Sequence, residues 1–137
     1  MKHGKRILSL LLALLLVTGC LSGLALTASA TDYYSLYVGA IQVTSDNQDD
    51  VLGDGNGGTG SVSFDPDTRT LTLNNATLTG VNGSGVFIDD NFYEWNSQLT
   101  IELVGTNTID GTAAGTSAFY GIRSSHRLNI RGSVFTL

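Results

Sequence analysis

The sequence has few of the residues that usually staple or rigidify a small fold. It contains one cysteine, Cys20, and one proline, Pro66. Cys20 lies in an apolar N-terminal run, so residues 31–137 have no thiol for a disulfide or for zinc binding through sulfur. Their one histidine, His126, supplies little imidazole for nucleophilic catalysis. We therefore expect a protein that is not an enzyme.

Lysine is also missing after Lys5, and the charge balance is acidic. All twelve acidic residues lie in 31–137, beside four arginines, which gives this part a formal charge of −8. Nucleic-acid binding requires a basic surface, so we exclude nucleic acid as a partner. An acidic chain of this kind fits a protein that stays soluble outside the cell and binds cations.

A helical period of apolar residues is absent from residues 31–137, where short runs with alternating apolar residues occur instead. Such runs are Leu71–Leu73, Leu99–Ile101 and Leu128–Ile130, each followed by a corner of small residues and a second short apolar run. Their first leucines lie 28 and 29 positions apart, within the period range of stacked repeats. The sequence thus predicts an all-β protein, a right-handed parallel β-solenoid whose short strands bury their apolar side by stacking.

The alternation also predicts which side chains face the core. Successive side chains of a strand point to opposite faces, so we expect alternate residues to face the core and the solvent. The inward residues are Leu73, Leu99, Ile101, Leu128 and Ile130, and the outward residues are Thr72, Thr100 and Asn129. Two later repeat units each begin with a glycine followed by an apolar residue, at Gly85 and Gly121.

The first thirty residues form a leader. A basic start is followed by the apolar run Ile7–Val17 and by Ala28-Ser29-Ala30, the small residues preferred at a signal-peptide cleavage site. We therefore expect a helical signal peptide over 1–30 and a secreted or cell-surface protein. Val17–Cys20 also resembles a lipoprotein box, so an anchor at a lipidated Cys20 is the alternative. A third possibility is an uncleaved leader that holds the protein in the membrane.

Beyond the leader, we divide the chain at residue 60. Residues 31–60 are expected to form a cap of two short strands, between Tyr33 and Thr44, followed by an acidic, glycine-rich loop. Residues 61–137 are expected to form the rungs of the solenoid, with a turn at Asp65–Thr68. Because the last residues are apolar and uncharged, we expect a chain truncated at its C-terminus that associates through its open strand edge.

Four segments resemble a known group of proteins: Leu36–Thr44, Asp50–Gly55, Val62–Ala76 and Leu99–Ile109. They are similar to the N-terminal part of large secreted or surface proteins of Firmicutes, which carry β-helix repeats of the carbohydrate-binding-domain type. The resemblance implies a β-helix that binds polysaccharide, such as a plant cell-wall or other extracellular glycan. It also implies that further rungs follow in the relatives.

The acidic loop is the candidate metal site. Five residues with oxygen ligands lie within eleven positions, namely Asp46, Asp49, Asp50, Asp54 and Asn56. Calcium accepts carboxylates and carbonyls in loose geometry, and the glycines allow backbone carbonyls to turn inward. The spacing differs from that of an EF-hand, and a solvated acidic turn is the alternative. We expect Asp49, Asp50, Asp54 and Asn56 to bind Ca²⁺ if the loop holds an ion.

The candidate carbohydrate site is an aromatic segment between two apolar runs, made of Phe92, Tyr93, Glu94, Trp95 and Asn96. Sugar rings stack their C–H faces on flat aromatic rings, and the carboxylates of Asp89 and Asp90 could bond to hydroxyl groups nearby. In the alternative, these aromatic residues fold over the wall of the protein and bind nothing.

The sequence therefore predicts a non-catalytic polysaccharide-binding module. A structural stalk or adhesin segment without sugar binding is the second interpretation, and a fragment of a calcium-dependent polysaccharide lyase is the third. Arg123, Arg127 and Arg131, four positions apart, are interpreted as a solvated basic edge.

Overall fold

The computed structural model describes residues 29–53, 57–92, 97–111, 120–132 and 135–136. Ten strands and no α-helix occur among these residues, so the predicted all-β class is confirmed. None of the described residues belongs to a helix long and apolar enough to cross a membrane. The chain divides into two units, Met1–Ala30 and Thr31–Leu137, and every strand lies in the second. The predicted leader helix lies outside the described residues.

The strands are short and follow one another through tight corners. They are β1 (Tyr33–Val38), β2 (Ile41–Thr44), β3 (Gly58–Asp65), β4 (Thr70–Leu78), β5 (Val86–Asp90), β6 (Gln98–Val104), β7 (Asn107–Ile109), β8 (Tyr120–Ser124), β9 (Arg127–Gly132) and β10 (Phe135–Thr136).

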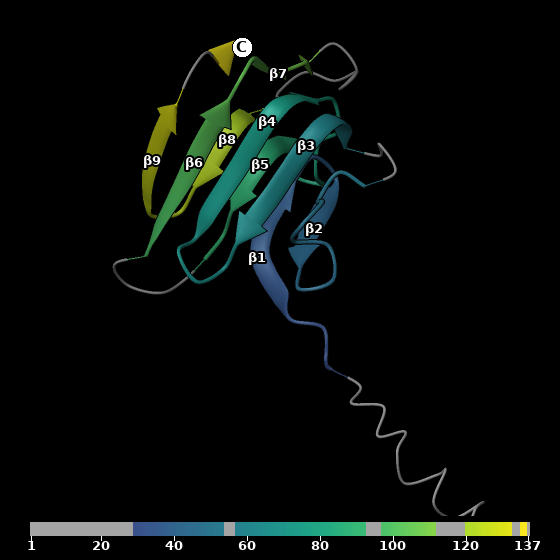
Figure 1. Cartoon of the computed structure of the whole chain (residues 1–137), viewed down its shortest axis with the longest axis vertical. Helices are drawn as coiled ribbons and strands as arrows, with labels where there is room; N and C mark the ends of the chain where they lie inside the picture. The colour runs from purple at the N-terminus through teal and green to yellow at the C-terminus, as the bar shows by residue number, and fades with distance from the viewer. Residues whose placement is uncertain (1–28, 54–56, 93–96, 112–119, 133–134, 137) are drawn as a thin grey trace, which may run out of the picture. The chain divides into compact units, whose positions relative to one another are not determined.

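These strands form two sheets. Sheet A has the order β2-β1-β5-β8, and sheet B has the order β10-β7-β4-β6-β9 with β3 paired to β4. Figure 1 shows β3, β4, β6 and β9 of sheet B in front of β1, β5 and β8 of sheet A. One cluster of buried apolar side chains draws on both sheets, so the core lies between them.

The N-terminal strands pair antiparallel. β1 pairs with β2 and with β5, and β3 pairs with β4 over Gly58–Asp65. The β1–β2 turn needs a glycine at position 39, where φ is +60° and a Cβ would lie 2.9 Å from the Cα of Gly57. Strand β3 therefore belongs to an antiparallel hairpin, and parallel pairing begins at Thr70 rather than at the expected start, Ser61.

The later strands pair parallel with partners about thirty positions further along the chain. Thr70 of β4 pairs with Thr100 of β6, and Leu99 of β6 pairs with Leu128 of β9. In sheet A, β5 pairs with β8 in the same sense. Strand β7 is paired parallel on both sides, with the end of β4 and with β10.

The register between β4 and β6 differs by two positions from the one that the leucine spacing predicts, whereas Leu99 pairs with Leu128 as that spacing predicts. Leu71 pairs with Ile101 rather than with Leu99, and Ile101 in turn pairs with Ile130. A shift of two residues leaves each side chain on the same face of its strand. Leu71, Leu99 and Ile101 are accordingly buried.

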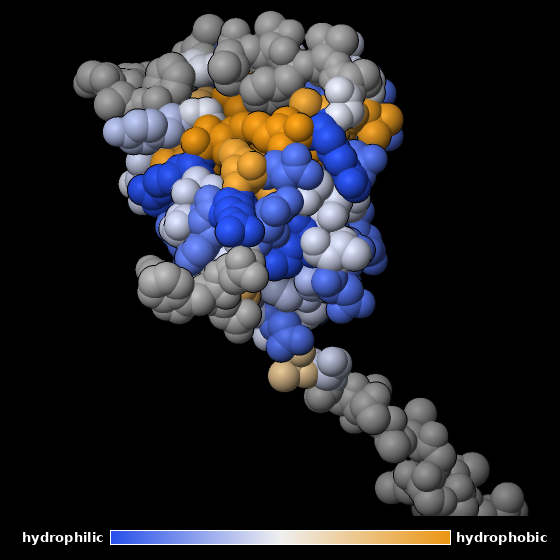
Figure 2. All heavy atoms as spheres, turned by 90° about the vertical axis from the view of Figure 1, so that its left-hand side faces the viewer, coloured by the Kyte–Doolittle hydropathy of each residue, from blue (hydrophilic) through white to orange (hydrophobic). Residues whose placement is uncertain are grey.

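Leu128 and Ile130 lie on the inward face of β9, as predicted, but they are not enclosed. Their side chains are 39% and 46% exposed, although they lie in register with buried Leu99 and Ile101. Strand β9 is the last in the order of sheet B, so among the described strands none covers its outer side. Figure 2 shows this end of the molecule, where an apolar band lies above a region of polar side chains.

The corner between β6 and β7 contains a buried asparagine. The side chain of Asn107 is fully buried and accepts a hydrogen bond from the amide of Ala76 at 2.9 Å. Its Nδ2 donates to the carbonyl oxygen of Val104 at 3.1 Å. Gly105, with φ +70°, brings the chain against the Asn75 side chain, which accepts a hydrogen bond from Thr106 N at 3.1 Å. Side-chain amides thus satisfy backbone groups that the turn leaves without ladder partners.

Candidate functional site

The outer face of sheet B carries polar side chains. Because Leu71 and Leu73 are buried, Thr72 lies on the opposite face of β4. The register places Thr72 beside Ser63 of β3 and Glu102 of β6. Glu102 is in turn in register with Arg131 of β9, and the two form an exposed ion pair of 2.9 Å. One row of the face therefore carries two hydroxyl groups and two charges on four adjacent strands.

A second row runs parallel to the first. Thr70 pairs with Thr100, and Thr100 pairs with Asn129. Adjacent strands lie about 4.8 Å apart, so these side chains form a ladder of hydrogen-bonding groups across the sheet. The face therefore presents hydrogen-bonding groups at a regular interval from strand to strand.

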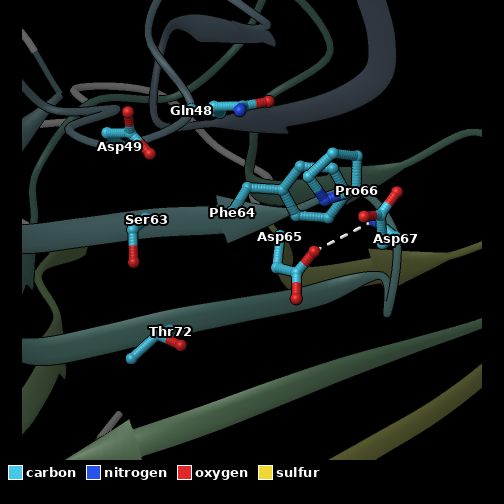
Figure 3. A pocket seen from close by; sticks show the side chains of 8 residues that line it. All are labelled: Gln48, Asp49, Ser63, Phe64, Asp65, Pro66, Asp67 and Thr72. Atoms are coloured by element: carbon cyan, nitrogen blue, oxygen red, sulfur yellow. Dashed lines mark hydrogen bonds between the residues drawn. The ribbon is translucent and has the colours of Figure 1, made fainter.

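A pocket of about 330 Å³ opens at the β3 edge of this face. Figure 3 shows its wall, which comes from three segments: the loop after β2, strand β3 with the following turn, and β4. The lining residues are Gln48, Asp49, Ser63, Phe64, Asp65, Pro66, Asp67 and Thr72. The pocket thus combines hydroxyl, amide and carboxylate groups with two apolar rings.

Backbone hydrogen bonds fix the loop that forms one wall. The amide of Phe64 donates to the carbonyl oxygen of Gln48, and the amide of Val51 donates to that of Val62, both at 2.7 Å. The loop therefore runs beside β3. The hydroxyl group of Tyr34 donates to Oε1 of Gln48 at 2.9 Å, and its ring packs edge-on against Phe64 with centroids 5.2 Å apart. Burial, aided by the charges of nearby aspartates, raises the pKa of Tyr34, so its hydroxyl remains a donor.

The opposite wall is the turn between β3 and β4. The carboxylate of Asp65 accepts hydrogen bonds from Oγ1 of Thr68 at 2.8 Å and from the amide of Asp67 at 3.0 Å. The hydrogen bond from the Thr68 side chain is the main cause of the lowered pKa of Asp65. The turn predicted at Asp65–Thr68 is present, and it holds an ionised carboxylate beside the pocket.

The predicted calcium ligands lie only partly within the structure. Asp49 is exposed at the pocket, and Asp50 is exposed and accepts a hydrogen bond from Gly53 N at 3.3 Å. Asp54 and Asn56 lie outside the described residues. Within the described part of the chain, no three side chains of His, Cys, Asp or Glu are placed to hold a metal ion. Calcium binding at this loop stays a prediction.

Of the predicted carbohydrate site, only Phe92 is described. Tyr93, Glu94, Trp95 and Asn96 lie outside the described residues. The guanidinium carbon of Arg69 lies 3.8 Å from the centroid of the Phe92 ring, a cation–π contact. One face of this ring therefore packs on the protein's own side chain. Whether Trp95 forms a sugar platform stays a prediction.

The expectation that Asp89 and Asp90 bond to sugar hydroxyl groups is wrong, because both are buried in ion pairs. Asp89 accepts from Nε and Nη2 of Arg123 at 2.8 and 2.6 Å and from Nδ2 of Asn82 at 2.8 Å. Asp90 accepts from Nη2 of Arg69 and from Oγ of Ser124, each at 2.9 Å. Asp89 thus links β5 to β8 within sheet A, and Asp90 links β5 to the turn before β4, so neither carboxylate is open to a ligand.

The pKa of Asp89 reflects the hydrogen bonds that its carboxylate accepts. Burial by itself would raise this pKa, but the hydrogen bonds from Arg123, Asn82 and Asn91 outweigh burial and keep the pKa below its ordinary value. Arg123 is thus a structural partner, which corrects its interpretation as part of a solvated edge. The sequence did not reveal this ion pair. If the repeats are aligned at Gly85 and Gly121, Asp89 lies beside Ser125, whereas the observed register places Asp89 beside Arg123.

Searches of family models, curated proteins and solved structures found no match to this chain.

Proposed function

We propose that this protein is a secreted or cell-surface module that binds polysaccharide without cleaving it, and that its fold is a right-handed parallel β-solenoid. Three parallel ladders support the fold: β4–β6–β9, β5–β8 and β4–β7–β10. All three join residues about thirty positions apart, as successive turns of one coil would. The antiparallel strands β1, β2 and β3 then act as the N-terminal cap.

The observation that carries the function is the pocket that opens onto the polar face of sheet B. A polysaccharide presents hydroxyl groups at a regular spacing along an extended chain, and the rows through Thr72 and Thr100 present hydrogen-bonding groups at the strand spacing. The pocket supplies carboxylate and amide acceptors, with Pro66 as an apolar surface for the C–H face of one sugar ring. One sugar residue would occupy the pocket, and its neighbours would lie across the face.

Affinity electrophoresis of the purified protein through gels that contain single plant or bacterial polysaccharides tests this proposal. We expect at least one polymer to retard the protein. Thr72→Val, which removes one hydroxyl group from the face, and Asp49→Ala, which removes a carboxylate from the pocket, should each weaken retardation about threefold to tenfold. Thr79→Val is the matched control, because Thr79 is also half-buried but lies after β4, outside the strands of sheet B.

Two results would overturn the assignment of the pocket. In the first, Thr72→Val and Asp49→Ala leave retardation intact, but Trp95→Ala removes it without changing the circular dichroism. This result would place the site in the aromatic segment. Absence of retardation by every polymer would favour the stalk or adhesin interpretation. The exposed apolar edge of β9 supports that second interpretation, because it is suited to stacking on protein. Release of sugar fragments from a retarding polymer would favour the lyase.

A further inference from the structure

The pocket at the β3 edge of the polar face carries an excess of negative charge. Among the described residues that line it are Asp49, Asp65 and Asp67, and none of them is a lysine, arginine or histidine. All three aspartates are exposed, and Figure 3 shows Asp49 on one side of the pocket with Asp65 and Asp67 on the other. Hydrogen bonds from Thr68 keep the pKa of Asp65 below its ordinary value, so this carboxylate is ionised at neutral pH. A ligand in the pocket would therefore lie among negative charges.

The wall of the pocket also has more hydrogen-bond acceptors than donors. An ionised carboxylate accepts hydrogen bonds and donates none. The side-chain donors of the wall are the hydroxyl groups of Ser63 and Thr72 and the amide nitrogen of Gln48. The amide oxygen of Gln48 already accepts a hydrogen bond from Tyr34. A sugar hydroxyl group has one donor hydrogen and two acceptor lone pairs, whereas an ammonium group has three donors and no acceptor. The wall is therefore complementary to an ammonium group.

The surrounding sequence is acidic as well. Residues 31–68 contain seven aspartates and no lysine, arginine or histidine. The guanidinium group of Arg69, directly after this segment, is already paired with buried Asp90. On the polar face, Arg131 is paired with Glu102. A uronic acid, sulfate or phosphate group in the pocket would thus meet like charges, which repel it.

We propose that the pocket selects a sugar residue that carries an ammonium group, and that the ligand is therefore a polysaccharide with unacetylated amino sugars. The ammonium group would lie among the three carboxylates, while neighbouring sugar residues bond to the polar rows of sheet B through their hydroxyl groups. Acetylation of the amino group would remove the charge and add an acceptor carbonyl, which the pocket disfavours. The inference rests on the proposed function, because it names the class of polymer that the same pocket would bind.

Isothermal titration calorimetry with four tetrasaccharides tests the inference. They are built from glucosamine, N-acetylglucosamine, glucose or galacturonic acid, and they are titrated at about pH 5.5, where carboxyl groups are ionised and the amino groups of glucosamine are protonated. We expect the glucosamine tetramer to bind at least about ten times more tightly than the N-acetylated and glucose tetramers, and the galacturonic acid tetramer not to bind. Equal or tighter binding of any of the other three tetramers would overturn the inference.

Failure of the inference is distinguishable from failure of the proposed function. If a polysaccharide retards the protein in the gels but the glucosamine tetramer does not bind, the inference is wrong and polysaccharide binding stands. If no polysaccharide retards the protein and no tetramer binds, both are wrong. Binding of the glucosamine tetramer with the expected preference supports both.

Removal of single charges separates the pocket from a general attraction between an acidic protein and a cation. Asp67→Asn should weaken binding of the glucosamine tetramer about threefold to tenfold, because the amide keeps the shape of the side chain but loses its charge. Asp46→Asn is the matched control, since Asp46 is also exposed and the net charge changes equally, but Asp46 does not line the pocket. Equal losses in the two variants would show that the tetramer binds the acidic surface at large, which would overturn the inference. Melting curves of both variants confirm that they are folded.

Discussion

At the scale of single residues, the fold contains two kinds of arginine–carboxylate pair that can be compared within one molecule. Asp89 is 1% exposed and its pair with Arg123 uses two hydrogen bonds. The pair of Arg131 with Glu102 lies on the surface, with both side chains more than two fifths exposed. Both pairs join strands that are adjacent and parallel. Their difference in burial decides what each contributes.

Asp89→Ala should lower the free energy of unfolding by about 3 kcal/mol, because it leaves the guanidinium group of Arg123 against a partly dry surface and removes acceptors from Asn82. Glu102→Ala, the control, should cost about 0–1 kcal/mol, since water replaces its contact. Urea unfolding measures both values. Equal losses would show that Asp89 is far more hydrated than its burial indicates.

The lowered pKa of Asp89 also makes stability depend on pH. A carboxyl group whose pKa is lower in the folded state than in the unfolded chain stabilises the fold above its ordinary pKa of 3.8. This contribution is lost as the pH falls through the lower, folded value. We expect the melting temperature to fall below about pH 4, and to fall less steeply in Asp89→Asn. Thermal melts from about pH 2 to about pH 7 measure the slope, and identical slopes in the two proteins would contradict this cause.

At the scale of strands, two isoleucines in register show that the contribution of an apolar residue to stability depends on whether another strand covers it. Ile101 and Ile130 are the same residue type in register on adjacent strands, but one is 1% and the other 46% exposed. Ile101→Ala should cost about 2–5 kcal/mol through lost burial and a cavity, and Ile130→Ala under about 1 kcal/mol. Thr100→Ala, on the outer face, should also cost under about 1 kcal/mol. Chemical denaturation tests all three, and a large loss for Ile130→Ala would mean that something covers β9 in solution.

The strand pattern was predictable from the sequence because alternation with a period of two depends only on neighbouring residues. The inward positions of Leu73, Leu99 and Ile101 follow from it. The register was harder, since the leucine spacing pairs Leu71 with Leu99, whereas the chain pairs Leu71 with Ile101. Both choices bury an apolar residue on an apolar residue, so hydrophobicity alone does not separate them.

The candidate pocket could not be predicted in the same way. Its wall joins Gln48 and Asp49 to the turn at Asp65 and to Thr72, and these residues meet only because the loop after β2 runs beside β3. No alternation or motif marks such a loop. The burial of Asp89 and Asp90 was equally hidden, because their arginine partners lie 34 and 21 positions away in the chain.

At the scale of the whole molecule, bound ions are the remaining source of stability to test, because residues 31–137 contain no cysteine that could form a disulfide. If the loop from Asp46 to Asn56 binds calcium, saturation at about a hundred times the dissociation constant should stabilise the fold by about 2.7 kcal/mol. Calcium should then raise the melting temperature, and EDTA should reverse the effect. Asp50→Asn should reduce the rise, and Asp32→Asn, outside the loop, should preserve it. A melting temperature that ignores calcium would leave the loop as a solvated turn.

Because of the parallel ladders, the resistance of the molecule to force should depend on the direction of the force. A force that pulls β9, the last described strand in the order of sheet B, away from β6 loads the hydrogen bonds between them one after another, so β9 should separate at low force. A force along the strands loads all the bonds of the β4–β6 and β6–β9 ladders together, and these should yield only at a much higher force. The same protein would thus be weak when unzipped from its edge and strong when sheared. The points at which a load acts on the protein would therefore decide which of the two behaviours is observed.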